Sequence, residues 1–126
     1  MSAETPGHLL ELWLAAFRSN DLPALVSLYD REYALVPAPG VAPVEGLAGA
    51  EGSLAHLLTL GVDFDFLGAT SVEHGDVAFV SAAWTERGAG PDGAYEFETR
   101  TSDMLRRQAD GTWKFLVNRL ARDVRQ

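Results

Sequence analysis

The feature that most constrains this chain is a two-residue period in its C-terminal half. From residue 62 onward, apolar and polar side chains alternate, as in the Asp-Phe-Asp-Phe run at 63–66. Such alternation is typical of β-strands that bury one face. Turn-forming links at 74–76 and 109–111 join neighbouring segments into antiparallel hairpins. Four long strands are therefore expected, over residues 62–73, 77–87, 95–108 and 112–122.

The first sixty residues follow a helical period instead. Leu9, Leu10, Trp13 and Phe17 recur at the spacing of one helix face, and Thr5 is a typical N-cap residue. This half of the chain also contains a segment rich in proline and glycine, which cannot pair inside a sheet. Helices are expected over residues 6–19, 22–29 and 48–60, a short strand over 33–36 and a loop over 37–46.

Helices that precede a run of strands indicate an α+β fold, with the three helices packed on one face of a strongly curved antiparallel sheet. The chain has 126 residues, which suits a single domain over residues 1–126. Hydrophobic residues make up 47% and charged residues 22%, which is typical of a folded domain rather than a disordered chain.

The charge balance disfavours two classes of partner. With 10 Lys and Arg residues against 18 Asp and Glu residues, the formal net charge is −8. Phosphate groups of nucleic acids and anionic membrane surfaces both need the opposite sign. The chain also has no apolar run near the roughly 20 residues of a membrane span and no visible signal peptide. We therefore expect no nucleic-acid or membrane partner and a cytoplasmic location.

Metal and cofactor chemistry has little support in the sequence. There is no cysteine, and the three histidines lack metal-ligand spacing. Asp63 and Asp65 share a strand face, where they favour a solvated outer surface over a cation site. No nucleotide-binding glycine motif is present. We expect neither a metal nor a cofactor.

Two segments resemble the nuclear transport factor 2-like superfamily. Residues 19–37 are similar to its helix junction and the leucine, tyrosine, acidic residue and strand that follow. Residues 104–115 are similar to the arginine-arginine and aspartate-glycine-x-tryptophan hairpin of SnoaL-like and ketosteroid isomerase-like members. When the order of the helices and strands is included, the resemblance covers about residues 6 to 120. It implies a cystatin-like cone whose wide end holds a cavity, in a superfamily that includes isomerases, cyclases, epoxide hydrolases and association domains.

This chain differs from ketosteroid isomerases at two positions where those members have catalytic residues. Those members place a general-base aspartate before a proline in the first strand, where this chain has Val36 and Pro37. They also use a tyrosine hydroxyl on the first helix, where this chain has Trp13 and Phe17. Steroid isomerisation is therefore not expected.

Arg100 is a candidate because epoxide-hydrolase members use an aspartate–arginine–aspartate set. Strand alternation places Glu98 on the same face as Arg100 and Asp103 on the opposite face, unless a bulge intervenes. A buried Glu98–Arg100 pair would mark a site. The alternative is that Glu96, Glu98 and Arg100 form the wet side of the sheet.

Asp103 is the best single carboxylate for SnoaL-like acid/base chemistry. In an apolar pocket its pKa would be raised, so that it could exchange protons near neutral pH. The alternative is an outward aspartate paired with Arg119 or Arg122. The catalytic candidates are therefore Asp103 and Arg100.

The expected ligand-binding residues are aromatic side chains together with a few residues near Asp103. Each aromatic could equally be part of the core, and Asn118 could equally lie on the surface. The candidates are Trp13, Phe17, Tyr29, Tyr33, Phe64, Trp84, Ser102, Met104 and Asn118.

Two classes of function remain open. The first is a protein that binds a small hydrophobic molecule in the cone cavity, with carboxylate acid/base chemistry of the isomerase, cyclase or hydrolase type as a further expectation. The second is a non-catalytic dimeric binding or association domain. Both faces of the strand at 77–86 are largely apolar, which predicts a homodimer through the sheet face.

Overall fold

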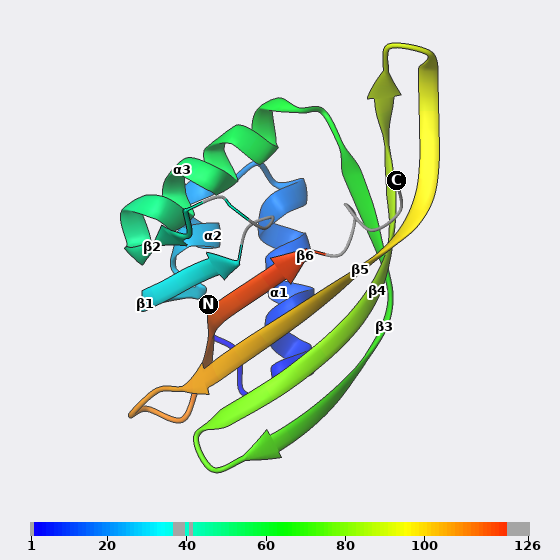
Figure 1. The fold of residues 1–126 in the computed structure, drawn as a ribbon. Helices are drawn as coiled ribbons and strands as arrows, with labels where there is room; N and C mark the ends of the chain where they lie inside the picture. Colours follow the sequence, from blue (N-terminus) through cyan, green and yellow to red (C-terminus); the bar gives the residue numbers. More distant parts are fainter. Residues whose placement is uncertain (1, 37–39, 41, 121–126) are drawn as a thin grey trace.

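The computed structural model describes residues 2–36, 40 and 42–120 and has the expected α+β fold. Its three helices pack on one curved sheet of six strands, as in a cystatin-like cone (Figure 1). The helices are α1 Pro6–Arg18, α2 Leu22–Val26 and α3 Gly46–Thr59. The strands are β1 Tyr29–Val36, β2 Val44–Glu45, β3 Asp63–His74, β4 Val77–Gly90, β5 Gly93–Arg107 and β6 Trp113–Leu120.

The sheet order is β2-β1-β6-β5-β4-β3. Strands β3 to β6 form the expected antiparallel run, and β1 joins it by pairing in parallel with β6. The sheet bends around α1, so that the helices occupy its concave side (Figure 1). The strand that follows α2 is therefore hydrogen-bonded to the last strand of the chain.

Side-chain caps explain where the first two helices begin. The Thr5 side chain accepts a hydrogen bond from the His8 backbone N–H at 3.1 Å, and Asp21 does the same for Ala24. Each cap satisfies a backbone donor that the first helical turn cannot. Between the helices, Asn20 adopts a φ of 55°, a conformation that asparagine tolerates better than most residues.

The region from 22 to 46 differs from the sequence-based expectation. The second helix ends at Val26, and β1 begins at Tyr29 rather than at residue 33. The reason is tertiary: the Phe115 N–H donates to the Leu28 carbonyl at 2.9 Å, which holds this segment against β6. The two-residue strand β2 lies within the expected loop, whose residues 37–39 and 41 are outside the described part of the chain.

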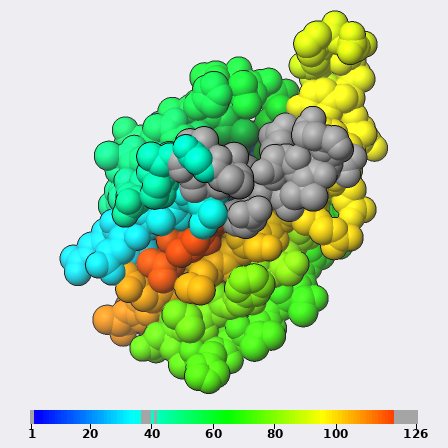
Figure 2. Space-filling model, viewed as in Figure 1, coloured from blue at the N-terminus to red at the C-terminus, as the bar shows by residue number. Residues whose placement is uncertain are grey.

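Strands β4 and β5 also extend further than expected. The strands predicted over 77–87 and 95–108 leave the glycine-rich segment 88–94 between them, but both strands continue into it and turn only at 91–92. Gly93 has a φ of 106°, which favours glycine. A Cβ on Gly88 would lie 2.6 Å from the Tyr95 hydroxyl oxygen, so the absent side chain makes room for that ring. The hairpin tip projects beyond the body of the molecule (Figure 2).

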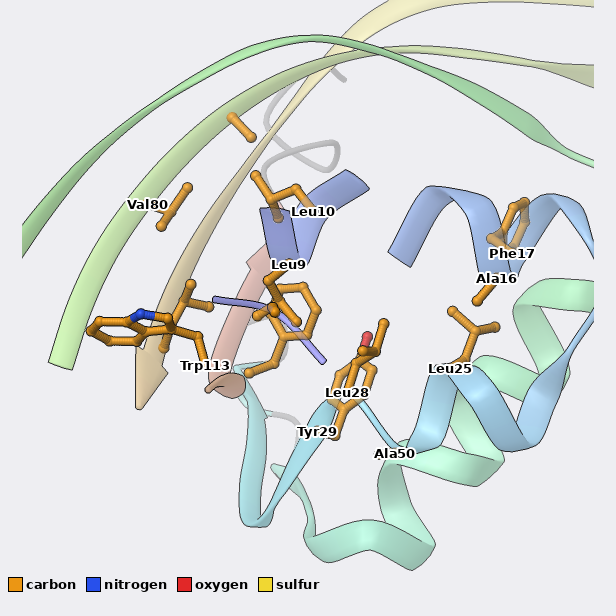
Figure 3. Close-up of a cluster of buried hydrophobic side chains, with 14 of the residues drawn as sticks. Leu9, Leu10, Ala16, Phe17, Leu25, Leu28, Tyr29, Ala50, Val80 and Trp113 are labelled. Carbon is orange, nitrogen blue, oxygen red and sulfur yellow. The ribbon is translucent and has the colours of Figure 1, made fainter. Parts of the chain in front are cut away.

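The hydrophobic core lies between the helices and the concave face of the sheet (Figure 3). Its most buried members, each no more than 2% exposed, come from helices, a loop and the sheet. They include Leu9, Leu10, Leu25, Leu28, Val80 and Leu105. Among the described residues, no helix has both the length and the apolar character needed to cross a membrane.

Candidate functional site

A cavity of about 390 Å³ lies between α1, α3 and the concave face of the sheet. This volume is in the range of small-molecule sites. Its walls are mostly apolar, with polar side chains from β1, β4, β5 and β6 and with Ser53 and His56 from α3. The lining residues that matter for the site are Leu10, Trp13, Tyr29, Tyr33, Leu54, Leu57, Phe64, Trp84, Glu86, Thr99, Thr101, Asp103 and Asn118.

The alternation of β5 decides which of its polar residues face this cavity. Thr99, Thr101 and Asp103 line it, while their neighbours Arg100 and Ser102 are on the other side of the strand. The irregularity between β5 and β6 falls only after Met104, so it does not disturb this order. Asp103 is consequently 3% exposed and faces the concave side of the sheet.

Asp103 belongs to a chain of hydrogen bonds that ends at a tyrosine of β1. The Asn118 side-chain amide donates to Asp103 Oδ1, and the Tyr33 hydroxyl donates to Asn118 Oδ1 at 2.8 Å. Asn118 is directly opposite Asp103 in the β5–β6 register, and Leu35, two residues after Tyr33, pairs with Asn118 across β1–β6. The parallel pairing of β1 with β6 therefore brings Tyr33 to the carboxylate.

A second arm of hydrogen bonds reaches Asp103 from β4. The Trp84 indole N–H donates to Thr101 Oγ1 at 3.1 Å, and the Thr101 side chain hydrogen-bonds to Asp103. Trp84 is 5% exposed, so this arm lies in the apolar wall of the cavity. The carboxylate is thus held by an amide and a hydroxyl.

The surroundings of Asp103 change its acidity. Burial raises the pKa of Asp103 to about 7, although the hydrogen bonds from Asn118 and Thr101 oppose the rise. None of the Lys, Arg and His side chains that the structure describes, which exclude those from residue 119 onward, forms an ion pair with it. Both protonation states are therefore populated at neutral pH, and the group can accept or donate a proton.

Aromatic rings form much of the remaining wall. The Trp13 indole N–H donates to the Tyr29 hydroxyl at 3.0 Å, and the Tyr29 and Tyr33 rings meet edge to face with centroids 4.7 Å apart. Burial raises the pKa values of Tyr29 and Tyr33, so that both phenols keep their protons. Both hydroxyls can therefore serve as hydrogen-bond donors over the physiological pH range.

The structure brings most of the sequence-based candidates to one cavity. Phe17 is an exception: it is buried but stacks behind Trp13, with ring centroids 5.1 Å apart, and does not line the cavity. Its alternative interpretation as a core residue fits its position. The candidates that line the cavity are Trp13, Tyr29, Tyr33, Phe64, Trp84, Asp103 and Asn118.

Three other candidates lie at positions that do not fit their expected roles. Arg100 lies on the outer face with its side chain 67% exposed and donates to Glu98 at 3.0 Å, as in the wet-face alternative. Ser102 and Met104 flank Asp103, so alternation directs them away from the cavity. Neither a catalytic role for Arg100 nor ligand contacts for Ser102 and Met104 fit these positions.

Sequence reasoning missed Glu86, an acidic residue of the cavity wall. Glu86 of β4 is 1% exposed, lines the cavity and accepts a hydrogen bond from the Tyr95 hydroxyl at 2.9 Å. A signal was present, because the alternation that buries Val80, Ala82 and Trp84 continues to residue 86.

A second buried aspartate lies outside the cavity. Asp30 is 3% exposed and accepts hydrogen bonds from Arg106 Nε at 2.9 Å and Arg106 Nη2 at 2.7 Å. Gln108 Nε2 donates to it at 3.0 Å. The Arg106 guanidinium holds the pKa of Asp30 well below its usual range. This network joins β1 to the end of β5 and lines a separate polar cleft of about 400 Å³.

The acidic pair on β3 is neutralised by arginines. Arg18 contacts Asp63 at 3.2 Å and Asp65 at 2.8 Å, and Arg87 contacts both carboxylates from β4. These four side chains tie the end of α1 to the β3–β4 edge. In the described ranges, no group of three or more His, Asp or Glu side chains could hold a metal ion.

Comparison with known families and structures gives one family match. Residues 10–116 match the SnoaL-like domain. No curated protein matches the chain.

Solved structures resemble the whole fold. A candidate ketosteroid isomerase from Shewanella frigidimarina has a TM-score of 0.77 at 16% identity, with 90% of this chain and 92% of that chain covered. A candidate dehydratase of the NTF2-like family from Streptomyces avermitilis has a TM-score of 0.75 at 18% identity, covering 90% and 91%. A candidate calcium/calmodulin-dependent protein kinase II association domain from Xanthomonas campestris has a TM-score of 0.73 at 17% identity, covering 90% and 82%. At these identities the likeness shows the fold alone.

Proposed function

Because the chain belongs to the SnoaL-like domain family, we propose that its cavity binds a small, largely apolar molecule and that Asp103 exchanges a proton with it. The observation that carries this proposal is a carboxyl group, 3% exposed in an apolar cavity, with a pKa near 7. Acid/base catalysis is most effective when the pKa of the catalytic group is near the working pH. Isomerase, cyclase and hydrolase reactions all use such proton transfers.

The proposal gives the neighbouring residues separate roles. As a carboxylate, Asp103 takes a proton from the ligand, and as an acid it returns the proton to another atom, so that no electrons are gained or lost overall. Asn118 and Tyr33 are positioning residues. Asn118 donates a hydrogen bond to Asp103, and Tyr33 holds Asn118 through a second hydrogen bond. Trp13, Phe64 and Trp84 supply apolar surface to the ligand.

Proton exchange can be measured directly with β-tetralone, an aromatic ketone that has acidic protons beside its carbonyl. In D2O, NMR should show faster deuterium incorporation with the wild-type protein than without it. Since a general base contributes about 10²–10⁴-fold, Asp103→Asn should lower the protein-dependent rate at least about 100-fold.

The matched control is Arg100→Met, which removes a charged side chain from the outer face of the same strand and should leave the exchange rate unchanged. Equal rates for Asp103→Asn and the wild type would contradict the catalytic role. If β-tetralone quenches tryptophan fluorescence but exchanges no proton, the binding part of the proposal stands alone.

A second candidate function, a dimeric association domain, is favoured by the outer face of the sheet. Phe79 is 53% exposed and is directly opposite Val72 on β3 and Met104 on β5, which are 66% and 39% exposed. Together they form an apolar patch across three strands, and such patches commonly mark interfaces. At least two structural neighbours are named as candidate association domains.

We infer that a second copy of the chain covers this patch. Sedimentation should then give twice the chain mass of 13.6 kDa, and Phe79→Glu should reduce it to one chain. Gly7→Glu adds the same charge at an exposed position of α1, away from this face of the sheet, and is the control for charge alone. A wild-type mass of one chain at micromolar concentration would contradict the dimer. A cytoplasmic location and a single domain over 1–126 stay predictions.

A further inference from the structure

The polar cleft beside Asp30 has no part in the proposed proton transfer. It has a volume of about 400 Å³, and basic side chains dominate its lining: Arg31, Arg106, Arg107 and Lys114. We propose that this cleft is a second binding site, and that its ligand is a small organic molecule that carries a phosphate monoester group. The proposal goes beyond the function proposed for the cavity and does not depend on it.

Two of the basic side chains in the cleft have no acidic partner. Among the lysine and arginine side chains that the structure describes, only those of Arg31 and Lys114 form no ion pair. The chain has 10 Lys and Arg residues and 18 Asp and Glu residues, so unpaired basic side chains are unexpected. Both nevertheless line the same cleft, which therefore carries uncompensated positive charge in an acidic protein. The basic side chains that do contact a carboxylate are those of Arg18, Arg87, Arg100, Arg106 and Arg107.

Asp30, the acidic residue in the lining of the cleft, has no acceptor site left for these two cations. Its Oδ1 accepts hydrogen bonds from Arg106 Nη2 at 2.7 Å and from the Glu32 backbone N–H at 2.8 Å. Its Oδ2 accepts from Arg106 Nε at 2.9 Å and from Gln108 Nε2 at 3.0 Å. An ionised carboxylate has about four acceptor sites, so these bonds fill them. The unpaired cations therefore lack an acceptor within the cleft, and a ligand with several acceptor oxygens would supply one.

The irregular pairing of β1 with β6 places both cations at this cleft. Between two paired positions, β1 has residues 30–33 where β6 has only Leu116, so the pairing of the two strands is interrupted there. Arg31 lies in the interrupted segment, and Lys114 lies on β6 two residues before Leu116. The two unpaired cations thus come from neighbouring strands and line one cleft.

The charge and the size of the cleft indicate the class of ligand. A phosphate monoester carries a charge of about −1.5 to −2 at pH 7 and three strong acceptor oxygens, which suits two unpaired cations better than a single carboxylate does. Arginine binds phosphate oxygens through paired N–H groups, and lysine binds them as a point charge. The cleft is much larger than a phosphate group alone. Leu47, which is 39% exposed, offers apolar surface to the organic part of the ligand.

The test compares phenyl phosphate, benzoate and inorganic phosphate by NMR. Two side chains report on the two sites separately, because the Gln108 amide lines the cleft and the Trp84 indole lines the cavity. Phenyl phosphate should shift the Gln108 side-chain resonance in a saturable way. It should bind about tenfold more tightly than benzoate, which lacks the second charge, and than inorganic phosphate, which lacks the organic part.

Two variants and a matched control test the unpaired cations. Arg31→Gln and Lys114→Gln should each weaken the binding of phenyl phosphate at least about tenfold, because each removes one charged donor. Neither substitution removes an ion pair that the structure describes, so both variants should keep the melting temperature of the wild type. Arg100→Gln changes the net charge equally on the outer face of β5 and should leave the affinity unchanged.

The outcomes distinguish this inference from the proposed function. If phenyl phosphate at millimolar concentration leaves the Gln108 resonance unchanged, the inference is overturned, whatever the cavity binds. The inference is also overturned if Arg100→Gln weakens binding as much as the two cleft variants, since net charge alone would then explain the effect. Equal binding of benzoate or inorganic phosphate would contradict the assignment of a phosphate monoester. Binding of β-tetralone, followed at the Trp84 indole, tests the cavity independently.

Discussion

Two aspartates, one near the start of β1 and one inside the cavity, expose equally little surface but have pKa values shifted in opposite directions. Asp30 and Asp103 are each 3% exposed. The Arg106 guanidinium keeps the pKa of Asp30 well below its usual range, whereas burial raises the pKa of Asp103 to about 7. A cationic partner therefore keeps Asp30 ionised, whereas deep burial beside neutral partners favours the protonated form of Asp103.

The difference assigns distinct tasks to the two regions. A permanently ionised Asp30 stabilises the contact between β1 and the end of β5, and its charge does not change in the physiological pH range. Asp103 has only neutral hydrogen-bonding partners among the side chains that the structure describes, so its charge can change near neutral pH. Under the proposed function, the outer ion-pair network contributes stability and the cavity exchanges the proton.

The largest expected effect concerns Asp103 and pH. Asp103 binds its proton more tightly in the folded chain, so its stabilising contribution is full below the unfolded pKa of about 4. That contribution is lost as the pH rises through the folded value of about 7. The loss is on the order of 4 kcal/mol between pH 4 and pH 8. Urea denaturation at several pH values should show it for the wild type and not for Asp103→Asn, and parallel pH profiles would contradict it.

Replacing Asp30 by asparagine should have the opposite effect on the free energy of unfolding at pH 8 from replacing Asp103. Since its folded pKa is depressed, Asp30 contributes stability that is present above the unfolded pKa of about 4 and is lost as the pH falls below it. Asp30→Asn should therefore destabilise the protein by about 3 kcal/mol at pH 8, whereas Asp103→Asn should stabilise it. If both variants move the urea midpoint at pH 8 in the same direction, the contrast between the two aspartates is contradicted.

Removing the amide that contacts Asp103 should sharpen the contrast. The Asn118 hydrogen bond favours the ionised carboxylate and so opposes the effect of burial. Asn118→Leu should therefore raise the pKa of Asp103 further, by about one unit, or about 1.4 kcal/mol. The carboxyl carbon resonance of Asp103, followed by NMR through a pH titration, measures this directly. Gln108→Leu, next to Asp30, is the matched control and should leave that resonance unchanged.

The smallest effect is expected on the outer face of β5. Arg100 and Glu98 form an exposed ion pair, and such pairs contribute under about 1 kcal/mol. Arg100→Met should change the free energy of unfolding by less than this amount and should not alter ligand-induced shifts in melting temperature. A larger change, or a lost ligand response, would mean that the two faces of β5 are not separated as the structure indicates.

Sequence periodicity was sufficient to predict the order of the helices and long strands, though not all of their bounds, because local side-chain patterns favour one type of element over the other. It could not decide which face of β5 is inside. Thr99, Thr101 and Asp103 alternate with Glu98 and Arg100, so both faces are polar and no apolar stripe marks the buried one. The three-dimensional arrangement resolves this, since β6 supplies Asn118 and α3 covers the cavity.

Tertiary contacts also explain the other differences. The start of β1 depends on Phe115, which is far away in sequence, and no local pattern at residues 29–32 announces this pairing. Gly88 and Gly90 read as turn residues, but cross-strand pairing extends β4 through both. Glu86 was overlooked because a charged residue is normally assigned to solvent. Its place in the alternation of β4 was the better guide.

The parallel pairing of β1 with β6 sets an order on assembly. Tyr33 and Asn118, which meet in the cavity, are 85 residues apart along the chain. Contacts this distant in sequence require the closure of a long loop and slow the search for the native state. During synthesis, β1 remains without its parallel partner until β6 has left the ribosome. The cavity is therefore completed only after β6 has been synthesised, and until then the apolar inner faces of the earlier strands are open to chaperones and to other nascent chains.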